Sequence, residues 1–167
     1  MKLLKKTFSN ANNKVLLYNL GLGEKKDKLF FNVNPLDSDL GTFSKYNSTE
    51  DIIKDKIDID TIDNIREKVG KPDVIKIDVE GFELYVIKGY NNLNTDYPII
   101  SLEWIDHFQE SSFQNLLKYF DDSWHYFYIG YNGLLYKKKS NFCGSDVLFI
   151  SEKNDSYEKV FSIIARV

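Results

Sequence analysis

The chain has 167 residues, of which 43% are hydrophobic and 28% charged, and this composition predicts a single folded domain over residues 1–167. With a formal net charge of −3 it lacks the positive field that would hold a polyanion, so we expect no nucleic-acid partner. The single cysteine, Cys143, excludes an internal disulfide and favours a reducing compartment. No apolar run reaches the ~20 residues of a membrane helix, so we predict a cytoplasmic protein without a membrane partner.

The first half of the chain predicts short strands before one helix. In chain order we predict a helix end over Met1–Asn13, a strand over Lys14–Leu20, a turn at Gly21 and Gly23, a strand over Lys28–Val33 and a loop over Asn34–Asp51. Apolar residues that alternate with aspartates over 57–61 predict a half-buried strand. The apolar spacing over 62–69 then predicts a helix that ends at Gly70.

The second half predicts strands that alternate with helices. In chain order we predict strands over Val74–Val79 and Ile99–Trp104, helices over Phe82–Lys88 and 113–120, a hairpin of His125–Ile129 and Leu134–Lys137, a strand over Val147–Ile150 and a last helix over 157–164. Ser111 or Ser112 is expected to cap the 113–120 helix, and Asn132-Gly133 predicts the tight turn of the hairpin. We therefore predict an α/β fold with a mainly parallel sheet, covered on both faces, and an antiparallel C-terminal hairpin edge.

Acidic residues stand at the carboxyl ends of two predicted strands. Asp78 and Glu80 end one strand, and Glu103 ends the next. Open α/β sheets bind ligands beyond these ends, and alternation puts Lys76, Asp78 and Glu80 on one face of their strand. Buried charges are costly unless they pair, reach water or contact a ligand. We expect the three carboxylates to line a ligand crevice; the alternative is a structural network in which Lys76 pairs with a carboxylate and Glu80 caps the following helix.

The same residues carry a family resemblance. The segment Asp73–Gly89, with Lys76-Ile77-Asp78-Val79-Glu80-Gly81 before a helix, resembles the signature of the FkbM family of S-adenosylmethionine-dependent methyltransferases. Further similar segments are Tyr18–Gly23, Asp60–Asp63, Pro98–Glu103 and Asp146–Ile150. The resemblance extends from about Lys14 to Ile150. It implies a Rossmann-like class I methyltransferase fold and methyl transfer from S-adenosylmethionine to a hydroxyl oxygen of a small molecule or sugar.

The resemblance also implies roles for individual residues. Asp78 would lie beside the methyl donor and the acceptor, as a general base or as an orienting group for the acceptor hydroxyl. Glu80 and Glu103 would position the acceptor or the local network. Asn19 and Leu20, at the end of an earlier strand, would join Asp78 in contacting the cofactor. A crevice lined with carboxylates also suits the positive sulfonium of the donor.

Residues at and after the end of the predicted Ile99–Trp104 strand are candidates for contacts with the acceptor. Trp104 could stack against a sugar, although core packing is the commoner role of such a ring. His107 could assist from the following loop, although a loop histidine is more often simply exposed. The three carboxylates could also hold Mg²⁺ as hard oxygen ligands, but dedicated metal-ligand spacing is missing, so we expect no metal.

The chain departs from the family at its N-terminal side. No glycine-rich turn precedes Gly21, and no strand with a ribose-binding acidic residue follows such a turn, so we predict an N-terminally truncated fold without the first two strands of the family. A strand-donating partner or a missing N-terminal segment would have to pair the strand edges that this leaves open. We therefore predict weak or no S-adenosylmethionine binding by this chain alone. The alternative to an active enzyme is a catalytically inactive remnant or interaction domain.

Overall fold

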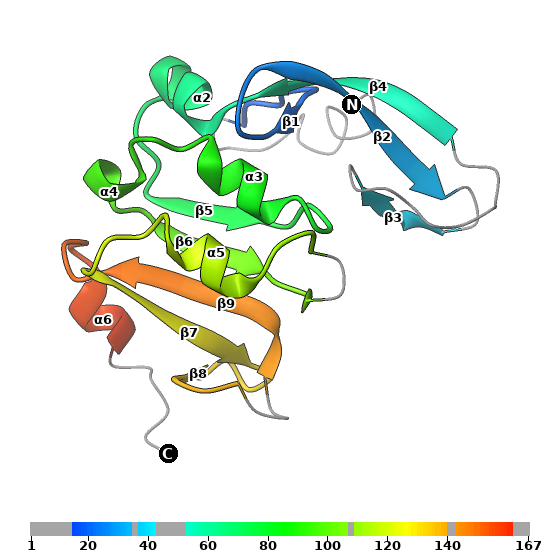
Figure 1. Cartoon of the computed structure of the whole chain (residues 1–167). Coiled ribbons are helices and arrows are strands. Elements are labelled where there is room, and N and C mark those ends of the chain that lie inside the picture. Colours follow the sequence, from blue (N-terminus) through cyan, green and yellow to red (C-terminus); the bar gives the residue numbers. More distant parts are fainter. Residues whose placement is uncertain (1–14, 35–36, 43–52, 107–108, 140–142, 162–167) are drawn as a thin grey trace.

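Figure 1 shows the computed structural model of the chain, which describes residues 15–34, 37–42, 53–106, 109–139 and 143–161. The strands form two mixed sheets, a four-stranded sheet of order β1-β4-β2-β3 and a five-stranded sheet of order β5-β6-β9-β7-β8. The predicted helix end over Met1–Asn13 lies outside the described residues, as does the end of the last helix.

The four-stranded sheet comes from the first part of the chain. Its strands are β1 (Gly21–Leu22), β2 (Asp27–Asn34), β3 (Asp37–Thr42) and β4 (Ile53–Asp60). The central strands β2 and β4 pair antiparallel from Asp27↔Ile59 to Val33↔Ile53, and this register sets Leu29 opposite Ile57. The short strand β1 pairs parallel with the end of β4. The predicted strands over Lys28–Val33 and 57–61 are confirmed, and both are longer than predicted.

Two predictions about this region are wrong. Residues 15–20 form no regular strand, and Gly21 belongs to β1 rather than to a turn, because β4 offers a partner only to Gly21 and Leu22. Leu16 is accordingly 49% exposed. The predicted loop over Asn34–Asp51 contains β3, since residues 37–42 pair with β2 and extend the sheet; residues 35–36 and 43–52 lie outside the described part.

The five-stranded sheet carries the predicted acidic strand ends. Its strands are β5 (Val74–Ile77), β6 (Ile99–Glu103), β7 (Trp124–Gly130), β8 (Leu135–Tyr136) and β9 (Cys143–Ser151). β5 and β6 are parallel, and the other neighbours are antiparallel. The predicted hairpin and its antiparallel edge are confirmed. The predicted mainly parallel sheet is wrong, because β9 lies between β6 and β7 and runs antiparallel to both.

The helices mostly follow the predicted pattern. They are α2 (Ile62–Val69), α3 (Glu83–Lys88), α4 (Leu93–Asp96), α5 (Phe113–Leu117) and α6 (Tyr157–Phe161). The hydroxyl of Thr61 caps α2 by accepting a hydrogen bond from the amide of Asn64 at 3.1 Å, and the helix ends at Gly70 as predicted. The four-residue α4 was not predicted. Ser112 is the N-cap residue of α5, as predicted, but its side chain makes no cap hydrogen bond.

The two faces of the five-stranded sheet are covered unequally. On one face α3, α4 and α5 pack over apolar strand residues, and the core residues here include Ile77, Ile100, Leu102, Phe149, Val86, Leu93 and Leu116. On the other face α6 packs near Phe127 and Ile150. No described helix covers β5 on this second face, where Val74 is 64% exposed. The prediction that this strand is covered on both faces is therefore wrong for the described residues, and its charged side chains reach water.

The two sheets meet closely at Gly89, which follows α3. A Cβ atom at this position would lie 2.0 Å from the carbonyl oxygen of Gly23, just after β1. The carbonyl of Gly89 also accepts a hydrogen bond from the amide of Asp63 at 3.3 Å. Position 89 therefore requires glycine, because no side chain fits between the two backbones.

Candidate active site

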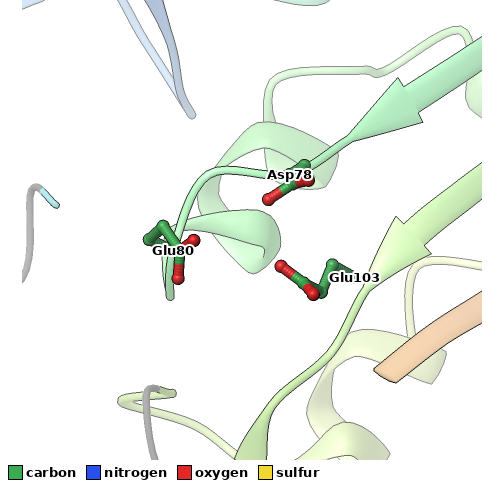
Figure 2. Close-up of side chains that lie close together, drawn as sticks. All are labelled: Asp78, Glu80 and Glu103. Atoms are coloured by element: carbon green, nitrogen blue, oxygen red, sulfur yellow. The ribbon is translucent and has the colours of Figure 1, made fainter. Parts of the chain in front are cut away.

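The three predicted carboxylates converge in the structure. β5 ends at Ile77, which pairs with Leu102 of β6, so the side chains one residue further, at Asp78 and Glu103, lie on the same side of the sheet. Glu80 lies on the turn that follows β5 and points toward both, as Figure 2 shows. One carboxylate oxygen from each of the three residues lies within 4.8 Å of the other two. The structure thus brings Asp78, Glu80 and Glu103 together at the carboxyl ends of two parallel strands.

Lys76 lies beside this group and neutralises part of its charge. Its Nζ is 2.6 Å from Asp146 Oδ1 and 3.7 Å from Asp78 Oδ2, and the lysine side chain is about half exposed. Partial burial lowers the pKa of Lys76, but the hydrogen bond to Asp146 and the charges of its acidic neighbours outweigh this and raise it. The alternative prediction that Lys76 pairs with a carboxylate is therefore confirmed, and the ammonium helps to hold Asp78 in place.

Glu103 is held from the neighbouring strand. The hydroxyl of Ser145, on β9, donates a hydrogen bond to Glu103 Oε1 at 2.7 Å. The main-chain carbonyl of Ser145 also accepts a hydrogen bond from the amide of Trp104 at 3.0 Å. Glu103 is half-buried, so this hydroxyl compensates for water lost from the carboxylate.

The turn that carries Glu80 has an unusual backbone. Glu80 has φ 49° and Gly81 has φ 98°, and a residue other than glycine in this region costs of order 1–3 kcal/mol. Partial burial, and then the charges of Glu103, Asp78 and Glu83, raise the pKa of Glu80. A strained backbone and mutually repelling carboxylates both work against stability, which is typical of a functional site.

Glu83 is a site residue that the sequence analysis missed. It opens α3, and its side chain is 1% exposed. Its carboxylate accepts hydrogen bonds from the amides of Val79 at 3.2 Å and Gly81 at 3.1 Å, and from Gln109 Nε2 at 2.7 Å. A glutamate in the first turn of a helix directly after a glycine turn is the signal that could have found it, since the free amides there attract an acceptor.

A cavity of about 210 Å³ lies beside Ser145 on β9. Trp104, Phe113, Tyr128 and Val147 form its apolar wall, and Asp106 and Ser145 are among its polar groups. Ser145 links the cavity to the carboxylates, because the same hydroxyl binds Glu103. Trp104 is 4% exposed, and its indole nitrogen donates a hydrogen bond to Asp106 Oδ1 at 2.7 Å, so the predicted acceptor-contacting ring forms a fixed part of this wall.

Two further predicted site residues, Asn19 and Leu20, do not join this group in the structure. Asn19 is exposed and Leu20 half-buried, and both precede β1 of the four-stranded sheet, whereas the carboxylates stand on the five-stranded sheet. Their cofactor role stays a prediction. His107 lies outside the described residues.

The charge of the crevice decides which groups fit it. Partly exposed carboxylates suit the positive sulfonium of S-adenosylmethionine. Their oxygens are also of the type that binds Mg²⁺, although exposed acidic groups commonly gather without an ion. An anionic ligand group would meet repulsion here.

A mixed α/β domain with acidic side chains beyond two parallel strands belongs to the class of α/β proteins that bind ligands at this edge of the sheet. The family model described as "Methyltransferase FkbM domain" matches residues 3–129, and the chain belongs to the FkbM methyltransferase family. The protein is thus a methyltransferase, its family uses S-adenosylmethionine, and the family implies a Rossmann-like fold. No curated protein and no solved structure matches the chain.

A membrane-crossing helix is not found in the described ranges, where every helix is too short or too polar to span a bilayer.

Proposed function

We propose that the protein transfers a methyl group from S-adenosylmethionine to a hydroxyl oxygen of a small molecule or sugar at the crevice of Asp78, Glu80 and Glu103. The observation that carries the proposal is the convergence of these carboxylates within 4.8 Å at the ends of neighbouring parallel strands, in a chain of the FkbM family. Bound S-adenosylmethionine would supply an electrophilic methyl group. The residues of the chain then have to hold the acceptor and take its proton.

Asp78 is the best-placed proton acceptor. Its side chain is 47% exposed, so an acceptor hydroxyl can reach it, and Lys76 fixes it from 3.7 Å. A carboxylate at hydrogen-bond distance orients the hydroxyl and accepts its proton as the oxygen forms the new bond to carbon. The negative charge of Asp78 also favours the positive sulfonium over a neutral thioether at the same position.

Glu103 and the adjoining cavity are proposed to position the acceptor. Ser145 holds the carboxylate of Glu103, which leaves its second oxygen to accept a hydrogen bond from a further hydroxyl of the ligand. The apolar wall of Trp104, Phe113 and Tyr128 offers ring surfaces to the body of the acceptor. The surplus of carboxylates favours an acceptor without phosphate or carboxylate groups.

A second candidate function is a catalytically inactive remnant or interaction domain. The observation that favours it is the outer edge of β5, which has no partner strand among the described residues and begins at the exposed Val74. An open strand edge can pair with another chain. This reading keeps the acidic strand ends but assigns them no chemistry.

The experiment that tests the proposal is a calorimetric titration with two ligands that differ at sulfur. S-adenosylmethionine carries a positive sulfonium, and S-adenosylhomocysteine has a neutral thioether in its place. We expect the protein to prefer the charged ligand and Asp78→Asn to remove this preference. Asp73→Asn is the matched control, because it neutralises an exposed carboxylate directly before the first residue of β5, at the opposite end of the strand from Asp78.

The outcomes separate the two candidate functions. Because the sequence predicts weak or no binding by this chain alone, the titration extends to millimolar ligand, and micromolar affinity would contradict that prediction. Equal affinity of the wild type for both ligands would mean that Asp78 does not interact with the sulfonium of the methyl donor. Absence of binding by either ligand would favour the interaction domain.

A further inference from the structure

Glu83 binds the backbone on both sides of Glu80. Its Oε1 lies 3.2 Å from the amide nitrogen of Val79, and its Oε2 lies 3.1 Å from that of Gly81. Glu80, the residue between these two amides, has φ 49°. The carboxylate of Glu83 therefore bridges the turn that carries Glu80. Figure 2 shows Glu80 on this turn, with Asp78 and Glu103 at the neighbouring strand ends.

The position of Glu83 is itself fixed from outside the turn. Its side chain is 1% exposed, and Gln109, beyond β6, donates a hydrogen bond from Nε2 to Oε2 at 2.7 Å. A buried carboxylate with three donors around it has no freedom to move, since each lost hydrogen bond would leave a buried polar group unsatisfied. The turn is thus clamped between α3 and the segment that follows β6.

We infer that Glu83 is a positioning residue, which holds the Val79–Gly81 turn so that the carboxylate of Glu80 stays beside those of Asp78 and Glu103; the catalytic consequence rests on the function proposed above. Without the clamp the strained turn relaxes, and Glu80 leaves the group. Glu83 itself does not touch the acceptor, because its buried carboxylate already accepts from Val79, Gly81 and Gln109.

Two substitutions separate positioning from a merely structural role. Glu83→Ala removes both acceptor oxygens, whereas Glu83→Gln keeps one oxygen that can still accept from Val79 and Gly81, because Oε1 alone lies 3.2 and 3.3 Å from the two amides. If Glu83→Ala does not fold, Glu83→Asp replaces it, since a side chain shorter by one methylene cannot reach both amides. Glu67→Gln, at an exposed position of α2, controls for the loss of one negative charge.

The readout is the titration of the Glu80 carboxyl group by carbon NMR, measured without cofactor or acceptor. Among the residues that the structure describes, the charged groups that act on Glu80 are Glu103, Asp78 and Glu83. In the wild type, in Glu67→Gln and in Glu83→Gln, adding Asp78→Asn should lower the pKa of Glu80, because the two carboxylates are still neighbours. In Glu83→Ala, the same addition should leave that pKa unchanged, because Glu80 has moved away.

Coupling between Asp78 and Glu80 that persists in Glu83→Ala, or in Glu83→Asp, would overturn the inference. Loss of coupling in Glu83→Gln as well would also overturn it, since the effect would then follow the charge rather than the hydrogen bonds. If methyl transfer is assayed, Glu83→Ala should lower its rate about 10²-fold while Glu83→Gln stays near the wild type. The titration result stands whether or not the methyl-transfer proposal does, so the two failures can be told apart.

Discussion

Two polar clusters flank the strands β5 and β6, and they differ in how their charges are balanced. At the amino ends of the two strands, Asp96 on α4 is 4% exposed and accepts hydrogen bonds from Arg66 and, at 2.8 Å, from Tyr90. The hydrogen bond from Arg66 lowers the pKa of Asp96 despite its burial. After the strands, Asp78, Glu80 and Glu103 place like charges together at a partly exposed edge.

The difference shows which cluster the fold needs. In the first cluster each carboxylate oxygen has a donor, so it stabilises the packing of α2 against α4. In the second, repulsion and a positive φ at Glu80 work against folding. Like charges gathered at a partly exposed edge point to binding or catalysis as the reason to keep them. Substitutions in the first cluster should therefore lower stability, whereas substitutions in the second should lower activity.

The largest effect is expected from the balanced cluster. Asp96→Ala leaves Arg66 and the buried Tyr90 hydroxyl without their acceptor, and should lower the free energy of unfolding by about 3 kcal/mol. Urea denaturation at neutral pH measures this loss. Asp73→Ala, which removes an exposed carboxylate, is the control. A loss no larger than that of the control would mean that the two clusters do not differ.

In the acidic cluster the effect should fall on activity instead. Asp78→Asn should lower methyl transfer by about 10²-fold, because the acceptor hydroxyl loses its proton acceptor, while the unfolding midpoint stays the same or rises. The measurement is formation of S-adenosylhomocysteine, by mass spectrometry, with neutral methyl glycosides as test acceptors. A clear drop in stability without a change in rate would assign Asp78 to the structural network.

The pH dependence of Glu80 sharpens the comparison further. Its pKa is raised above the ordinary value of 4.5, so the folded state holds this proton more tightly than the unfolded chain does. The stability of the wild type should therefore fall as the pH rises from the ordinary value through the raised one. Glu80→Gln removes this fall and should stabilise the protein at pH ~7 by about 0.5 kcal/mol, with no gain at acidic pH. Denaturation curves at neutral and at acidic pH provide the test, and an equal stabilisation by Glu80→Gln at both would contradict this prediction.

The smallest effect is expected at Lys76. Its side chain is 48% exposed, and the pairs that it forms with Asp146 and Asp78 are open to water. Lys76→Gln should lower the free energy of unfolding by only about 0.3 kcal/mol, and added salt should reduce even this difference. Thermal denaturation at low and high salt provides the test. A large, salt-independent loss would mean that Lys76 is as important to folding as Arg66.

The elements that depend on local pattern could be predicted from the sequence. The helix α2 and its end at Gly70 follow from apolar spacing and an end signal. The hairpin of β7 and β8 follows from its Asn-Gly turn. The pairing of the strands could not be predicted in the same way, because β9 enters the sheet between β6 and β7, and no local pattern shows which distant strands will be neighbours.

The candidate site, like the fold, could be predicted only in part from the sequence. Asp78, Glu80 and Glu103 were found because charges at strand ends conflict with a buried strand. Glu83 was missed because a glutamate in a first helical turn is usually an exposed residue, and only the three-dimensional turn shows its carboxylate beneath the backbone of Glu80. The cavity beside Trp104 combines residues of β7 and β9 with Phe113 of α5 and the segment after β6, so no single stretch of sequence describes it.

Gly89 illustrates how a signature residue can be essential for a reason unrelated to methyl transfer. Because the carbonyl of Gly23 would lie 2.0 Å from any Cβ at this position, every other amino acid must push β1 and its partner strands away from α3. In a deep mutational scan, intolerance at position 89 would therefore report on the docking of two substructures, whereas intolerance at Asp78 would report on chemistry. Selections for activity alone would score both positions alike, and a separate abundance measurement is what distinguishes them.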